Sequence, residues 1–214
     1  MIFLPRYHLF FSLIIVIFYI NIPPSWGSTI NIGQSFSQPI PAHGDGLEWM
    51  SPVSLIVSNH AVIKDLDVYF DITHTNVVDL DIFLDCPWGQ TIMLKDDALM
   101  KKFWKEAPWQ NMYGTIFDDQ SDKTLTQGLP PYTGHFLPAQ GNSLSLCNGH
   151  DINGIWTLRI FDMAYGNMGD LDRWELHFDI NHAPEPSTIF LFILVALFLL
   201  IKTKPTSRKH HHSY

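Results

Sequence analysis

The chain has 214 residues, a formal net charge of −8 at pH 7 and two cysteines. This length allows one domain of ordinary size together with targeting segments. A chain this acidic repels the phosphate backbone of nucleic acids, which excludes nucleic-acid binding from the expected functions.

The charges are unevenly distributed along the chain. Glu185 is the only acidic residue after position 183, whereas five of the 13 Lys and Arg residues lie in the terminal segments, namely Arg6, Lys202, Lys204, Arg208 and Lys209. The acidic character therefore belongs to the central region. A basic cluster at the end of a chain is typical of a membrane topology signal and not of a ligand site.

Residues 1–28 have the pattern of a secretory signal peptide. Arg6 gives the segment a weakly positive start, residues 9–20 form an apolar run, and residues 25–27 offer small side chains for cleavage. The run of about 12 residues is shorter than the roughly 20 that a membrane-spanning helix needs. This favours cleavage over an uncleaved membrane anchor.

The first half of the exported region predicts strands. Residues 29–54 are rich in Gly, Pro and Ser, and predict an irregular lead-in with one strand near residues 30–32. A short strand is expected at residues 55–57. Apolar residues then occupy every second position of residues 66–72 and of residues 80–84, which is the pattern of strands with one buried face.

The middle of the chain is less regular. A turn at residues 87–90 leads into a short predicted strand at residues 91–94. Residues 96–113 have no clean period and predict a loop with at most one helical turn. A further strand is expected at residues 144–146.

The clearest strand pattern lies near the end of the domain. Residues 154–162 and residues 171–178 each place their large apolar side chains, including Trp156 and Trp174, at alternate positions. The glycine-rich residues 165–169 predict a turn between them. Short, evenly spaced strands without a helical period predict an all-β sandwich.

Three blocks of this sequence resemble a known family. They are Asp71-Ile-Thr-His-Thr75 with the following Asp79-Leu-Asp-Ile-Phe-Leu84, then Asn153-Gly-Ile-Trp-Thr-Leu-Arg-Ile-Phe-Asp162, then Gly166-Asn-Met-Gly-Asp-Leu-Asp-Arg-Trp-Glu-Leu-His-Phe178. Their order is similar to that in the P domain (P/Homo B), which follows the protease domain in furin- and kexin-type convertases and recurs in bacterial exported proteins. The chain departs from the family pattern at Trp88, Gln90 and Ile155.

The resemblance implies a jelly-roll β-sandwich at residues 55–181 and no catalytic residues, because P domains support a neighbouring protease domain without catalysing a reaction. We expect no protease domain in this chain, and we expect His74 to be a structural hydrogen-bonding residue. The sequence contains no Gly-x-Ser-x-Gly, His-Glu-x-x-His or Cys-x-x-Cys motif, which agrees with that expectation.

Residues 183–209 resemble a PEP-CTERM sorting signal. The motif of Pro184, Glu185 and Pro186 precedes an apolar run at residues 189–201 and a basic tail at residues 202–209, an order that predicts a C-terminal transmembrane helix. About 13 apolar residues at about 1.5 Å each reach only about 20 Å, against a hydrocarbon core near 30 Å. A plain tail anchor is the alternative.

The second resemblance implies a location. In that family an exosortase recognises the tail of a precursor held in the inner membrane. We therefore expect export by the Sec route in a Gram-negative bacterium, and a mature form at the cell surface or in the extracellular matrix.

These features predict a non-catalytic surface or matrix protein with an adhesive or structural role, whose tail has the exosortase and the membrane as partners. Two alternatives stay open. The domain could be a carbohydrate-binding module for exopolysaccharide, or an accessory domain of a separately encoded subtilisin-like serine protease.

Calcium is the one cofactor that the sequence favours. Oxygen-rich loops in an exported acidic β-domain suit this hard cation, and the candidate ligands are Asp79, Asp81, Asp118, Asp119, Asp162 and Asp170. The alternative is that these aspartates lie at strand ends and on solvated faces, where their charge prevents edge-to-edge pairing.

Aromatic residues in predicted loops are candidates for stacking on a ligand. They are Trp88, Trp104, Trp109 and Tyr113. The alternative is that these rings cover the ends of the sandwich.

The two cysteines, Cys86 and Cys147, both lie in the exported region, where an oxidising compartment favours a disulfide. The bond would close a loop of about 60 residues and stabilise the fold by roughly 4 kcal/mol in the chain-entropy model. Two separate buried thiols are the alternative.

Overall fold

The computed structural model describes residues 27–44, 47–98, 110–181, 193–196 and 198–199. Contacts divide the chain into two units, Met1–Asn181 and His182–Tyr214, and each is described by itself. In the second unit, residues 193–196 and 198–199 are helical. No helix within the described residues has the length and hydropathy needed to cross a membrane.

Several predicted segments lie outside the described residues. These are the signal peptide up to residue 26, the sorting motif of Pro184, Glu185 and Pro186, and the basic tail at residues 202–209. Their assignments stay predictions.

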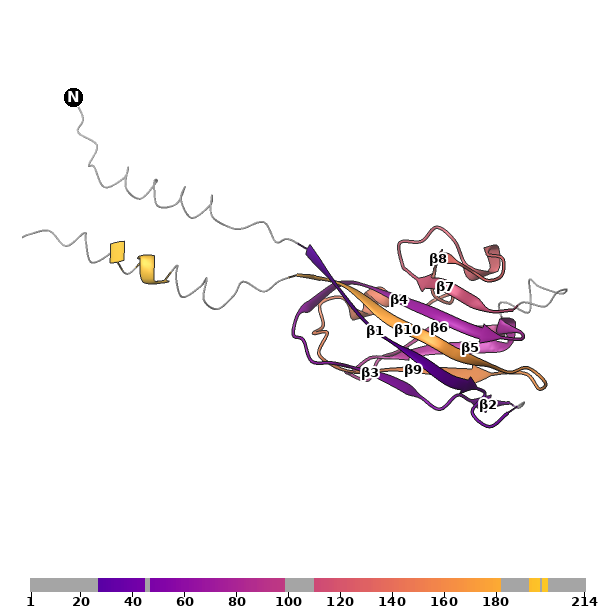
Figure 1. Ribbon diagram of the computed structural model, residues 1–214. Helices are drawn as coiled ribbons and strands as arrows, with labels where there is room; N and C mark the ends of the chain where they lie inside the picture. Colours follow the sequence, from indigo (N-terminus) through magenta and orange to yellow (C-terminus); the bar gives the residue numbers. More distant parts are fainter. Residues whose placement is uncertain (1–26, 45–46, 99–109, 182–192, 197, 200–214) are drawn as a thin grey trace, which may run out of the picture. The chain divides into compact units, whose positions relative to one another are not determined.

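The described part of the first unit contains ten strands in two five-stranded sheets (Figure 1). The first sheet has antiparallel neighbours except for its last pair, which is parallel. Its order is β1 (Gly27–Ile40), β10 (Gly169–Asn181), β4 (Val62–His74), β7 (Met112–Phe117) and β8 (Gly134–Phe136).

The second sheet is antiparallel throughout. Its order is β2 (Glu48–Trp49), β9 (Gly154–Asp162), β5 (Leu80–Asp85) and β6 (Thr91–Lys95), and β3 (Val53–Val57) also pairs with β9. Three short 3-10 helices connect strands, namely η1 (Val77–Asp79), η2 (Leu125–Gln127) and η3 (Leu144–Cys147).

The hydrophobic core lies between the two sheets. Trp156 of β9 and Phe178 of β10 are fully buried, with ring centroids 5.3 Å apart, so the inner faces of the two sheets meet there. Both strands alternate buried and more exposed residues, as their period-two sequences predict. The prediction of an all-β sandwich is confirmed, while the finer assignment as a jelly roll stays a prediction.

Two local predictions were wrong. The lead-in, predicted as irregular with one strand near residues 30–32, contains the longer strand β1, which pairs with β10 on both sides of a register shift between Ser35 and Gln38. Its inward residues, such as Ile30 and Ile32, are only partly buried because β1 is an edge strand, so its apolar pattern is weak. Residues 144–146 lie in η3 and not in a strand, because Ser143 caps a helical turn there.

Candidate functional site

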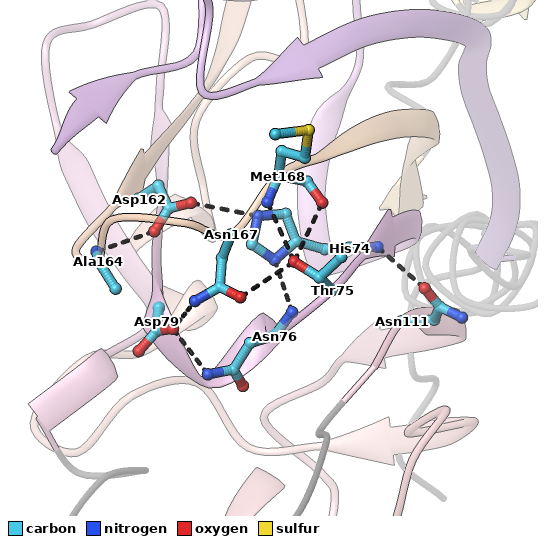
Figure 2. Close-up of polar contacts among 9 residues, drawn as sticks. All are labelled: His74, Thr75, Asn76, Asp79, Asn111, Asp162, Ala164, Asn167 and Met168. Carbon is cyan, nitrogen blue, oxygen red and sulfur yellow. Dashed lines mark hydrogen bonds and ion pairs between the residues drawn. The ribbon is translucent and has the colours of Figure 1, made fainter. Parts of the chain in front are cut away.

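A network of polar contacts lies where the end of β4 meets the turn between β9 and β10 (Figure 2). β4 contributes His74, its last residue, and β9 contributes Asp162. Asn167 and Met168 come from the turn, and Asn76 and Asp79 come from the segment around η1. Residues far apart in sequence thus converge at one end of the sandwich.

His74 and Asp162 form a buried pair at the centre of this cluster. Both side chains have no exposed surface, and His74 Nε2 lies 3.2 Å from Asp162 Oδ2. The backbone N–H of Asn76 donates to His74 Nδ1 at 3.2 Å, so Nδ1 is the acceptor nitrogen and the ring proton is on Nε2, facing the carboxylate. The Nε2–Oδ2 contact is poorly aligned for a hydrogen bond, so it is mainly electrostatic.

The backbone around the pair is fixed by further hydrogen bonds. The N–H of Ala164 donates to Asp162 Oδ1 at 3.0 Å, and the N–H of His74 donates to Asn111 Oδ1 at 2.9 Å. Asn111 has φ 61°, a left-handed conformation that asparagine tolerates better than most residues.

Asp79 ties η1 to the turn between β9 and β10. Its Oδ2 accepts hydrogen bonds from Asn76 Nδ2 at 2.7 Å and from Asn167 Nδ2 at 2.9 Å. Thr75 Oγ1 donates to Asn167 Oδ1 and accepts from the N–H of Met168. These contacts hold the turn against the end of β4.

This cluster lacks the parts of a nucleophilic site. The nine residues of Figure 2 include no serine and no cysteine, and the hydroxyl of Thr75 is engaged by Asn167 and Met168. The His74 and Asp162 side chains are also sealed from solvent. A base without a nucleophile or an open approach supports the structure and does not catalyse acyl transfer.

A cluster of three carboxylates lies next to a buried lysine. Asp81, Asp96 and Asp97 each place one oxygen within 4.8 Å of the others. Lys95 is buried, and its Nζ donates to the carbonyl of Val78 at 3.1 Å and to that of Leu80 at 2.5 Å.

Burial lowers the pKa of Lys95 to about 8, while the neighbouring carboxylates, Asp81 first, act to raise it. Burial also raises the pKa of Asp81, against the hydrogen bond from the N–H of Asp97. This cluster therefore already has a resident cation, the ammonium of Lys95.

The structure distributes the six calcium candidates over separate places. Asp79 and Asp162 belong to the buried cluster of Figure 2, and Asp81 lies near Lys95. Asp119 accepts from Ser143 Oγ and from the N–H groups of Leu144 and Ser145, at the start of η3. Asp118 faces His135, and Asp170 pairs in register with Thr73. Calcium binding stays a prediction.

The candidate aromatic residues also have different environments. Trp88 stacks on His150 at 4.1 Å between centroids and packs edge-on against Trp156, so it covers the core. Tyr113 is half exposed, and its OH hydrogen bonds with Thr73 Oγ1 at 2.7 Å. Trp104 and Trp109 lie outside the described residues.

A further aromatic group was not predicted from the sequence. On the outer side of the second sheet, the ring centroid of Trp49 lies 4.9 Å from that of Phe161 and 5.8 Å from that of Phe83, and Arg159 lies over the Trp49 ring. Arg159 is held by a bidentate pair with Asp85. The one sequence feature that could have indicated this group is that its aromatic residues alternate with the buried residues of their strands.

The two cysteines are neighbours in space. Cys86 and Cys147 are free buried thiols whose sulfur atoms lie 3.5 Å apart. The contact with Cys86 and burial raise the pKa of the Cys147 thiol. The two thiols are thus unbonded neighbours in the structure, and formation of the disulfide stays a prediction.

A pocket of about 520 Å³ opens beside β6 and η2. Its lining is largely apolar and includes Leu94, Leu125 and Leu137, together with the charged Lys95 and Asp96. The lining contains no histidine, serine or cysteine. It offers no nucleophile with an adjacent base.

Comparison with known families gives one match, since the family model described as the proprotein convertase P-domain matches residues 63–178. A search of curated proteins found no match.

Two solved structures of an Aeromonas sobria serine protease are similar to the chain. The complex of the protease with the chaperone ORF2 has 15% sequence identity and a TM-score of 0.43, covering 78% of this chain and 29% of that chain. The protease alone has 14% identity and a TM-score of 0.41, with the same coverage. The chain thus spans less than a third of either protease chain.

Proposed function

The chain belongs to the proprotein convertase P-domain family, and we propose that it is an exported, non-catalytic P-domain module that acts at the cell surface or in the extracellular matrix. Its role is adhesive or structural. In proprotein convertases the P-domain is a non-catalytic accessory domain.

The buried pair of His74 and Asp162 is the observation that supports a non-catalytic role most strongly. These residues come from two of the sequence blocks that resemble the family, and both are sealed inside a network that fixes the end of the sandwich. Side chains that are fully used to hold backbone segments together are not available to a substrate.

The sorting part of the proposal rests on the sequence of the tail. The motif of Pro184, Glu185 and Pro186, the apolar run at residues 189–201 and the basic residues 202–209 have the order of a signal processed by an exosortase. We propose that this tail holds the precursor in the inner membrane until it is processed.

Fractionation of the extracellular matrix tests the role of the module. We expect the mature protein to remain with the polysaccharide fraction and to be released when the polysaccharide is digested. Recovery of the protein in a stable complex with a subtilisin-like protease, absent from the matrix, would contradict the proposal. It would support instead the alternative of an accessory domain for a separately encoded protease, which the family membership favours.

The outer aromatic group favours binding of exopolysaccharide as a second candidate function. Trp49 is 41% exposed beside Phe83, Phe161 and Arg159, and exposed rings flanked by fixed polar groups are suited to stacking on sugars. Under this candidate function, Trp49→Ala abolishes retention on the isolated polysaccharide. Tyr165→Ala, which removes a more exposed ring from the turn between β9 and β10, leaves retention unchanged.

A further inference from the structure

Three potential metal ligands meet on neighbouring strands of the first sheet. Asp67 lies in β4, Asp118 directly follows β7, and His135 lies in β8. β4 pairs with β7, and β7 pairs with β8. One carboxylate oxygen from each aspartate and one imidazole nitrogen lie within 4.8 Å of one another.

We propose that Asp67, Asp118 and His135 form a binding site for a divalent transition-metal ion of the Zn²⁺ class. This site is independent of the proposed function. It shares only Asp118 with the carboxylates predicted to bind calcium.

The distances suit a common ion. Asp118 Oδ2 lies 2.8 Å from His135 Nδ1. Two ligands of a tetrahedral ion, each at about 2.0–2.1 Å, are about 3.3–3.4 Å apart. Asp118 and His135 can therefore share one ion after a side-chain adjustment of about half an ångström, and Asp67, whose carboxylate oxygen lies within 4.8 Å of both, supplies the third ligand.

Asp67 supplies the second observation that points to a ligand. Its Oδ1 is buried and accepts no hydrogen bond from any described residue. A buried carboxylate oxygen without a donor is costly, and a cation in contact with it removes that cost.

The charges around Asp67 favour a cation as well. Asp118, Asp65 and Asp179 place negative charge near Asp67, and the imidazole of His135 is the neighbour of opposite character. The cluster of Asp81, Asp96 and Asp97, in contrast, has the ammonium of Lys95 beside it. The fold thus places a lysine ammonium beside one carboxylate cluster and only an imidazole beside the other.

The donor atoms select the class of ion. One imidazole nitrogen and two carboxylates suit borderline divalent ions such as Zn²⁺, whereas Ca²⁺ prefers six to eight oxygen ligands. The side chain of His135 is 53% exposed, so an ion can enter from solvent. Three protein ligands leave a fourth tetrahedral position for water.

Calorimetric titration of the full chain with Zn²⁺, in detergent, tests the site. His210, His211 and His212 are replaced by alanine in all samples because a histidine tract binds Zn²⁺ by itself. In this background we expect one Zn²⁺ per chain. His135→Ala and Asp67→Asn are expected to weaken binding about tenfold or more.

A matched control separates this site from other histidine–carboxylate pairs. His60 contacts Asp151 at 2.8 Å, as His135 contacts Asp118. Among the described residues, however, no third potential ligand atom lies within 4.8 Å of both His60 and Asp151. His60→Ala should bind Zn²⁺ like the parent. Unchanged affinity in His135→Ala, or no binding by the parent, would overturn the proposal.

Thermal melting provides a second readout. Zn²⁺ should raise the melting temperature of the parent and of His60→Ala, and should leave that of His135→Ala unchanged. Asp67→Asn keeps the shape of the side chain and removes a repelling charge, so without metal it should melt no lower than the parent. Loss of Zn²⁺ binding in that variant cannot then be assigned to unfolding. An equal rise with Zn²⁺ in the parent and in both site variants would contradict the site.

Discussion

At the scale of single residues, His74 shows that a residue of a family motif can have a structural role. His74 contacts Asp162, receives a hydrogen bond from the backbone of Asn76 and has no exposed side-chain surface. The sequence reasoning expected a structural hydrogen-bonding role for His74. It could not identify Asp162 as the partner, because that contact depends on where β4 and β9 end in the two sheets.

We predict that His74→Ala lowers the free energy of unfolding by about 3 kcal/mol or more, because it leaves the Asp162 carboxylate buried beside a cavity. Equilibrium unfolding in urea measures this change. His60→Ala, which removes an exposed histidine with a carboxylate partner, should have little effect. Equal stability of the two variants would show that the buried pair does not hold the fold together.

The raised pKa of the Asp67 carboxyl group, caused mainly by burial, predicts that the free energy of unfolding of chelator-treated protein depends on pH. Its pKa in the folded state, about 7, lies above the ordinary value of 3.8. The folded state therefore binds the proton more tightly than the unfolded state, and this group makes folding less favourable as pH rises from about 4 to about 7.

Asp67→Asn removes this penalty. Its gain in unfolding free energy should be small near pH 4, grow through pH 5–7 and then remain constant at higher pH. Urea unfolding at a series of pH values measures the difference between the two proteins. A difference independent of pH would contradict the raised pKa.

At the scale of elements, the period-two patterns predicted where several of the strands lie, but not which strands pair with one another in the sheets. Residues 66–72, 80–84, 154–162 and 171–178 were predicted as strands and lie in β4, β5, β9 and β10. Only residues 30–32 of β1 were predicted as a strand, because its inward apolar residues are few and only partly buried. The meeting of Asp67 with His135 could not be predicted, since it depends on the parallel pairing of β7 and β8.

The close approach of the start of β10 to the end of β4 predicts a requirement for glycine at position 169. A Cβ there would lie 1.9 Å from the carbonyl oxygen of Thr73 and 2.6 Å from His74 Cα, both backbone atoms. Gly169→Ala should destabilise the domain by about 2 kcal/mol or more. Gly27→Ala, which meets no atom within 4 Å, is the control in a thermal melt. Matching melting temperatures would show that the start of β10 can move away from β4.

The contact between Cys86 and Cys147 predicts a disulfide that joins the end of β5 to η3 under oxidising conditions. The oxidised protein should be more stable than the reduced protein by roughly 4 kcal/mol. Thiol labelling and unfolding with and without reductant measure the two effects. Free thiols after exposure to oxidant, or equal stability of both forms, would contradict the prediction. The double variant Cys86→Ser and Cys147→Ser should not respond to reductant.

At the scale of the whole molecule, sequence blocks were more informative than individual site residues. The resemblance to the P domain predicted a module at residues 55–181, and the family match covers residues 63–178. In contrast, the six predicted calcium ligands lie at several separate places, because loop carboxylates are brought together or separated by strand pairing that the sequence does not encode locally.

Export and sorting are the part of the account that determines where this P-domain acts, and the mass and location of the mature protein test it directly. The comparison is made in cells with and without the exosortase. The account predicts a species that begins near Ser28 and lacks the residues after Pro186, found at the surface or in the matrix only when the exosortase is present. A chain that keeps its tail and stays in the inner membrane of both strains would contradict it.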